Sequence, residues 1–132
     1  DLLELSAEPA CWRSYGGIGA QGPATVKPDS YVRLGVGDYE DSFFVEVDQG
    51  TEGSQTLDRK LKEYVAYEAS GTEQDRHGVF PRVLWLAPDA DRAEVIERCI
   101  GQLPAASREL FAVAVQADVL DAVSGTAKAT HS

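Results

Sequence analysis

Basic residues are scarce in this sequence, and it contains no long hydrophobic run. The 132 residues include 12 lysines and arginines against 22 aspartates and glutamates, a formal net charge of −10. An acidic surface offers no broad attraction to a phosphate backbone or an anionic lipid, so DNA contact would need a local basic patch, a metal ion or a partner. No stretch approaches the roughly 18 apolar residues of a membrane span, and no basic segment followed by an apolar run opens the chain. The sequence therefore predicts a cytoplasmic protein that does not enter a membrane.

Cysteine and histidine are also rare. Cys11 and Cys99 are too few for a disulfide framework, fit a reducing compartment, and are interpreted as buried, reduced thiols. His77 and His131 have no metal-ligand spacing around them and are interpreted as surface residues. Trp12 and Trp85 could be interaction residues, yet a tryptophan beside a strand usually belongs to the core.

The length predicts one domain over residues 1–125, followed by a frayed tail at 126–132. The chain begins without a methionine, directly in the apolar segment DLLELSAEP. We therefore expect it to be part of a longer protein.

Hydrophobic periodicity predicts a mixed α/β fold. Alternating or continuous apolar residues predict strands, and 3.6-residue spacing predicts helices from Gln55 to Ser70, ended at Gly71, and from Asp89 onward. Ser54 or Thr56 could cap the first helix. The predicted strands are 2–7, 31–37, 41–48, 80–88 and 110–115. The second and third form an antiparallel pair, the fourth is buried on both faces, and crossover connections complete a mixed central sheet flanked by helices.

The remaining segments are predicted to be irregular or short. The glycine-rich segment 15–24 and the polar segment 71–78 are predicted loops, and 117–123 is a predicted helical turn. The glycine-rich segment lacks the Lys-Ser/Thr and the strand–helix context of a phosphate loop.

Two carboxylates end the third predicted strand. Alternation places Glu46 and Asp48 on one face of that strand, where like charges repel unless a cation, a base or solvent stands between them. Asp29, at the start of the preceding strand, could complete a set of hard oxygen ligands for a divalent metal. Solvated carboxylates at a strand end are the alternative interpretation.

Lys60 is the cation that helical phase brings toward this group. It lies beside the inward-facing Tyr64, whereas Arg59 and Lys62 are predicted to face water. Metal-assisted phosphodiester hydrolysis requires carboxylates that hold an ion and a lysine that orients water or offsets phosphate charge. The predicted site is Asp29, Glu46, Asp48 and Lys60.

The segments KPDSYVRL, FFVEVDQGTEGSQTLDRKLKEYVAY, FPRVLWLAPDADR and LFAVAV resemble the replication-relaxation family of plasmid and integrated-element proteins in Gram-positive, especially actinobacterial, hosts. The resemblance covers Glu8 to about Val115. It implies a domain similar to the PD-(D/E)XK restriction-endonuclease fold, preceded by a DNA-binding winged helix that this sequence lacks. It also implies that Asp29 is the aspartate of PD and Glu46 the acidic residue of (D/E)XK. The sequence departs at Asp48, where the nuclease pattern has lysine, so either the lysine has moved to Lys60 or catalysis has been lost.

Two functions follow from these observations. The first is a Mg²⁺-dependent nuclease or nickase with Asp29, Glu46 and Asp48 as metal ligands. The second is a catalytically silent regulatory domain that forms a homodimer or docks a replication protein while the upstream winged helix binds DNA, and the net charge favours it. A basic rim of Lys27, Arg33, Arg59, Lys60 and Lys62 around an acidic pocket would support the nuclease, and a flat apolar patch elsewhere would support the interaction domain.

Overall fold

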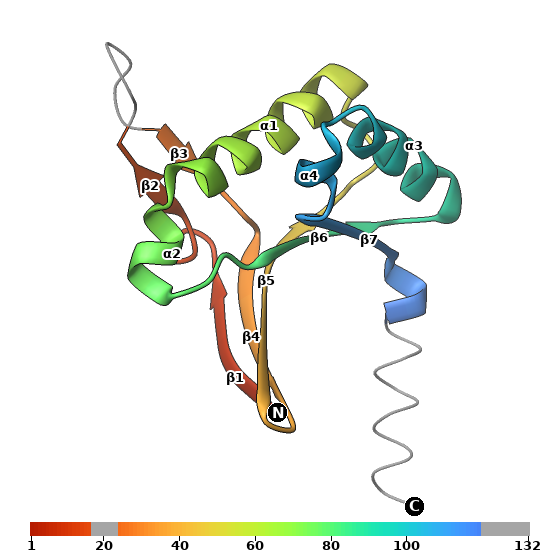
Figure 1. The fold of residues 1–132 in the computed structure, drawn as a ribbon. Helices are drawn as coiled ribbons and strands as arrows, with labels where there is room; N and C mark the ends of the chain where they lie inside the picture. The colour runs from red at the N-terminus through yellow and green to blue at the C-terminus, as the bar shows by residue number, and fades with distance from the viewer. Residues whose placement is uncertain (17–23, 120–132) are drawn as a thin grey trace, which may run out of the picture.

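The computed structural model describes residues 1–16 and 24–119, in which strands form one large and one small sheet (Figure 1). The large sheet has the strand order β1–β4–β5–β6–β7, and the small sheet pairs β2 with β3. The strands are β1 (Leu2–Ala7), β2 (Arg13–Tyr15), β3 (Ala24–Val26), β4 (Ser30–Val36), β5 (Tyr39–Val47), β6 (Arg82–Ala87) and β7 (Phe111–Val115). All five strands expected from the sequence lie in the large sheet.

The large sheet is mixed, as predicted. β1 pairs with β4 and β4 with β5 in antiparallel fashion, and a tight turn at Gly37 joins the latter two. β6 is parallel to both β5 and β7, because α1 and α3 supply the crossover connections. This mixed sheet with flanking helices is consistent with the fold class that the family resemblance implies.

Helices connect and cover the strands in the described part of the chain, with α1, α3 and α4 on one side of the large sheet (Figure 1). They are α1 (Ser54–Ser70), α2 (Thr72–His77), α3 (Ala90–Gly101) and α4 (Ala105–Arg108). The expectation that Ser54 or Thr56 caps α1 was wrong, because Gly53 is the N-cap and no side chain accepts a cap hydrogen bond. Gly71 ends α1 with φ of 73°, as predicted, and Asp89 caps α3 by accepting a hydrogen bond from the Arg92 amide.

Several segments differ from the sequence prediction: the short elements β2, β3 and α4 were not predicted. The polar segment after Gly71, predicted as a loop, contains the helix α2, whose one buried side chain is Glu73. β6 is not buried on both faces: Val83, Trp85 and Ala87 are buried under the helices, while Leu84 and Leu86 on the other face are only partly buried. Residues 116–119 are helical, in agreement with the first part of the predicted turn, and residues 120–123 of that turn lie outside the described residues.

The core lies between the large sheet and the helices α1 and α3. Phe44 of β5 contacts the rings of Tyr64 and Tyr67 from α1, and Trp85 is 1% exposed. Cys11 and Cys99 are buried free thiols, as predicted. Apolar burial of this size is the main stabilising term in a domain of this length.

The β2–β3 hairpin forms an arm that is fixed to α2 by a buried ion pair. The Arg13 guanidinium lies 3.1 Å from Glu73, and the Tyr67 hydroxyl donates to the same carboxylate. Glu73 is 0% exposed, so this pair is shielded from solvent and holds the arm against the domain. Most of the predicted loop 15–24, and the predicted tail 126–132, lie outside the described residues.

Among the described residues, no helix has the length and apolar character that crossing a membrane requires.

Candidate functional site

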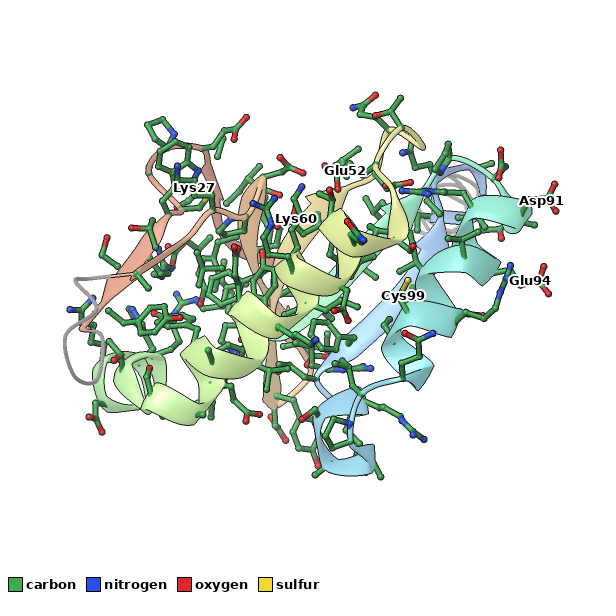
Figure 2. All side chains as sticks on the ribbon, turned by 90° about the horizontal axis from the view of Figure 1, so that it is seen from above. Lys27, Glu52, Lys60, Asp91, Glu94 and Cys99 are labelled. Atoms are coloured by element: carbon green, nitrogen blue, oxygen red, sulfur yellow. The ribbon has the colours of Figure 1, made fainter. Side chains whose placement is uncertain are left out.

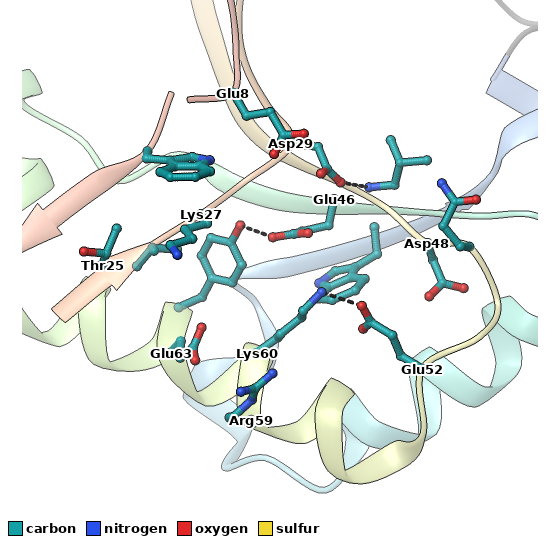
Figure 3. Close-up of a pocket in the computed structure, with 16 residues that line it drawn as sticks. Glu8, Thr25, Lys27, Asp29, Glu46, Asp48, Glu52, Arg59, Lys60 and Glu63 are labelled. Carbon is teal, nitrogen blue, oxygen red and sulfur yellow. Dashed lines mark hydrogen bonds and ion pairs between the residues drawn. The ribbon is translucent and has the colours of Figure 1, made fainter. Parts of the chain in front are cut away.

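A cavity of about 590 Å³ opens at the carboxyl end of β5, between the large sheet, the first turns of α1 and the β2–β3 arm (Figure 3). Its charged lining residues are Glu8, Lys27, Asp29, Glu46, Asp48, Glu52, Arg59, Lys60 and Glu63. Six carboxylates against three cations make the cavity acidic, so a phosphate is not attracted there without a bound cation. All four residues of the predicted site line this one cavity.

Asp29 and Glu46 meet on neighbouring strands. The Asp29 amide donates to the Val45 carbonyl at 2.9 Å, and the Val47 amide donates to Asp29 Oδ2 at 2.6 Å. Because these bonds continue the β4–β5 ladder, the Asp29 carboxylate is held beside Glu46 (Figure 3). The two carboxylates that the family resemblance singled out are therefore neighbours.

Glu46 is a buried carboxyl group whose acidity is altered by its surroundings. It is 6% exposed, and the Tyr64 hydroxyl donates to Oε1 at 2.6 Å. Burial raises the pKa of Glu46 to about 7, the negative charge of Asp29 adds to this, and the hydrogen bond from Tyr64 opposes it. Burial also raises the pKa of Tyr64, so its hydroxyl keeps the proton that it donates. A group with this pKa exchanges a proton near neutral pH.

Asp48 points to the same side of the sheet as Glu46, as strand alternation predicted, but toward a different helix. Its carboxylate accepts from Arg92 of α3 through Nε at 2.6 Å and Nη2 at 3.0 Å, and from the Gly50 amide at 3.0 Å. The side chain of Asp48 is 1% exposed and that of Arg92 is 13% exposed. This bidentate pair neutralises the charge of Asp48 within the protein.

Lys60 reaches the cavity from α1, as its helical phase predicted. Its ammonium group donates to Glu52 Oε1 at 2.6 Å. Burial alone would lower the pKa of Lys60, but the hydrogen bond to Glu52 and the charge of Glu46 raise it. Lys60 is therefore a fixed cation in the field of the carboxylates.

The basic rim expected of a nuclease is formed in part. Lys27, Arg59 and Lys60 line the cavity, although Arg59 was predicted to face water. Arg33 pairs with acidic residues at the other end of the sheet, and Lys62 pairs with an acidic residue of its own helix. Figure 2 shows Lys27 and Lys60 along the same edge of the molecule as Glu52.

Of the three predicted metal ligands, Asp29 and Glu46 each keep a carboxylate oxygen that could contact a divalent cation, whereas Asp48 does not. Val47 engages one oxygen of Asp29 and Tyr64 one oxygen of Glu46, which leaves each carboxylate a second oxygen. Mg²⁺ is commonly held by one or two carboxylates, with water and phosphate completing its coordination. Arg92 holds both oxygens of Asp48. Within the described part of the chain, no group of three or more His, Cys, Asp or Glu side chains is arranged to hold a metal ion, so the three-carboxylate ligand set stays a prediction.

The partners that hold the site residues in place were not predicted from the sequence. Arg92 lies in the first turn of the helix predicted from Asp89 onward, where its guanidinium can reach the strand end beside it. Glu52 and Tyr64 lie in a segment that resembles the family, but neither was predicted to bind Lys60 or Glu46. The position of Tyr64 one helical turn after Lys60 was the usable signal.

A family model described as replication-relaxation matches residues 2–83, a segment that includes Asp29, Glu46, Asp48 and Lys60. No curated protein and no solved structure is significantly similar to the chain.

Proposed function

This chain belongs to the replication-relaxation family, and from that premise we propose that it processes DNA during the replication or relaxation of a plasmid or other mobile element. We propose further that the cavity hydrolyses a phosphodiester bond with the help of Mg²⁺, in the cytoplasm. The observation that carries this proposal is the pair of neighbouring carboxylates, Asp29 and Glu46, with Lys60 in the same cavity.

Asp29 and Glu46 would hold the cation, each through the oxygen that its hydrogen bond leaves free. Bound there, the cation would lower the pKa of a coordinated water and offset the negative charge of the phosphate. Asp48 would join this set only when Arg92 releases it. The cation should bind before the DNA, because the acidic cavity repels a phosphate until the cation offsets the charge of its carboxylates.

The remaining residues position charge and protons. Lys60, held by Glu52, places a fixed ammonium group where a scissile phosphate would carry negative charge. Glu46, with a pKa of about 7 in the metal-free protein, loses its proton near neutral pH and can then hold the cation. Tyr64 fixes the orientation of Glu46 through its hydroxyl.

The test is cleavage of supercoiled plasmid DNA by the purified protein, with Mg²⁺ or with EDTA. We expect nicked or linear product with Mg²⁺ only. Glu46→Gln and Lys60→Ala should each lower the rate by about 100-fold or more, the usual effect of losing a preorganised charge at the reacting group. Lys62→Ala is the matched control, since Lys62 lies on α1 with a 67% exposed side chain and pairs with Asp58 away from the cavity. A wild-type protein that leaves both supercoiled and nicked DNA intact with Mg²⁺ and with Mn²⁺ rules the proposal out.

A catalytically silent regulatory domain is the second candidate, and two observations favour it. Arg92 occupies both oxygens of Asp48. The sheet face opposite α1 also carries exposed apolar side chains, among them Leu5, Val36 and Val47. Light scattering tests this candidate: a dimer in a protein that does not cut DNA, converted to a monomer by Leu5→Lys, supports it.

A further inference from the structure

We propose that Trp12 and Lys27 form a subsite that stacks one unpaired nucleobase at the mouth of the cavity, so that the DNA taken by this protein is single-stranded there. This inference rests on the proposed function, because it names the substrate class of the same cavity. The two residues line that cavity together with Asp29, Glu46 and Lys60.

Trp12 is presented by a fixed backbone. Its amide donates to the Pro9 carbonyl at 3.0 Å, and the Cys11 amide donates to the Ala7 carbonyl at 3.2 Å. The neighbouring Cys11 is 0% exposed, and its thiol donates to the Pro28 carbonyl at 3.1 Å. The indole therefore stands on a turn that is anchored on both sides, which limits the entropy lost when a ligand stacks on it.

Lys27 lies across the arm from Trp12. The register Arg13↔Val26 brings the residues one step beyond it, Trp12 and Lys27, next to one another. The Lys27 ammonium group lies 4.9 Å from the centroid of the indole ring, within cation–π range. The arm thus offers an aromatic face and a positive charge at one point, and these are the two features that recognise a base and its phosphate.

The exposure of Trp12 sets it apart from the other tryptophan. Trp12 is 38% exposed, although the sequence favoured a core position, whereas Trp85 is 1% exposed. The cavity beside Trp12, at about 590 Å³, has the size of a small-molecule site rather than of a groove that holds a duplex. Bases inside a duplex are stacked on one another and cannot lie against a side chain, so the ring can be used only by a base that is unpaired or flipped out.

The cations continue from this subsite into the cavity. Lys27 on the arm, and Arg59 and Lys60 on α1, line the same space, and Figure 2 shows Lys27 and Lys60 near one another. A strand whose base stacks on Trp12 would have its adjoining phosphate beside Lys27 and its next phosphate toward Lys60. This path leads to Asp29 and Glu46, where the proposed cleavage takes place.

The experiment measures binding of a fluorescently labelled oligo(dT) by anisotropy at low salt, in EDTA and again with Ca²⁺, because the acidic cavity repels phosphate until a cation offsets its carboxylates. Electrophoresis of the recovered oligonucleotide shows that it was not cut during the measurement. Trp12→Ala should weaken binding by about 5- to 100-fold, the range for loss of one stacked base, whereas Trp12→Phe should keep most of the affinity. Lys27→Ala should weaken binding and reduce the slope of log K against log salt by about 0.7, as expected for one phosphate contact on a single strand. Tyr39→Ala, which removes a 79% exposed aromatic ring elsewhere on the sheet, is the control and should bind like wild type.

Fluorescence provides a second readout that does not depend on affinity. Trp85→Phe leaves Trp12 as the remaining tryptophan, and oligo(dT) should quench its emission. The proposal is overturned by wild-type affinity in Trp12→Ala, by equally tight binding of a duplex, or by no binding of oligo(dT) at all. If binding depends on Trp12 but the protein does not cut DNA with Mg²⁺, the subsite is supported and the proposed hydrolysis is refuted. If Trp12→Ala cuts DNA at the wild-type rate, the hydrolysis is supported and the subsite is refuted.

Discussion

The ionisation of Glu46 should make the stability of this protein depend on pH in a direction opposite to that of most carboxylates. Glu46 is 6% exposed, and burial raises its pKa to about 7, against 4.5 for an ordinary glutamate. At about 1.4 kcal/mol for each pH unit between the two values, ionising Glu46 costs roughly 3 kcal/mol more in the folded chain than in the unfolded chain.

The sign follows from proton binding. Between pH 4.5 and 7 the unfolded chain has lost the Glu46 proton and the folded chain still holds it. The unfolded state binds fewer protons in this window, so stability from this group is complete below pH 4.5, is lost as pH rises to about 7, and then levels off.

Glu46→Gln isolates this contribution, because glutamine stays neutral and its carbonyl can still accept from Tyr64. The free energy of unfolding of both proteins is measured by urea titration at pH 4 and at pH 8. We expect the stability of Glu46→Gln relative to wild type to increase by about 3 kcal/mol between these pH values. Glu68→Gln, an exposed position on α1, should follow the wild-type profile. The reasoning is refuted if the difference in free energy of unfolding between Glu46→Gln and wild type changes by less than about 1 kcal/mol from pH 4 to pH 8.

Two further substitutions test the fold around the site. Arg92→Ala leaves the buried Asp48 carboxylate without its partner and should lower the free energy of unfolding by about 3–5 kcal/mol. Arg98→Ala, at an exposed position on the same helix, should stay within about 0.5 kcal/mol of wild type. Equal effects of the two substitutions would mean that the ion pair does not hold α3 to the end of β5. Gly71→Ala should lower the free energy of unfolding by about 1 kcal/mol, because Gly71 has φ of 73°, a conformation that alanine adopts with strain. Gly101→Ala should leave the stability unchanged or raise it, because a Cβ there meets open space and the backbone is ordinary. Thermal unfolding of both variants measures these effects.

The large sheet could be predicted because its strands carry the strongest period-2 signals. The missed elements are those whose local pattern is too short for any period. β2 and β3 have three residues each, and α2 has six residues and buries a glutamate rather than an apolar stripe. α2 and the arm owe their positions to the buried pair of Arg13 and Glu73, residues that are 60 positions apart in sequence. No local pattern contains that information.

The candidate site divides in the same way. Strand parity placed Glu46 and Asp48 on one side of the sheet, and helical phase placed Lys60 at the cavity. The hydrogen-bond partners of Asp48 and Lys60 could not be predicted, because they depend on the distances between elements that pack together only in the folded chain. α3 brings Arg92 within 2.6 Å of Asp48, and the segment before α1 brings Glu52 within 2.6 Å of Lys60. Both partners therefore depend on the packing of α1 and α3 over the sheet.

The hydrogen bonds that satisfy the buried carboxylates also limit what the cavity can bind. Glu46 is most stable when neutral, yet a cation needs its ionised form, so binding below pH 7 has to displace a proton first. Asp48 is already neutralised by Arg92, and a cation there would have to displace a guanidinium that makes two short bonds. Asp29 is the remaining carboxylate of the predicted set, with its backbone contact made through one oxygen only. A cation would therefore contact Asp29 first, and Glu46 would bind it after losing its proton. Asp48 would bind it only after its ion pair with Arg92 of α3 has broken.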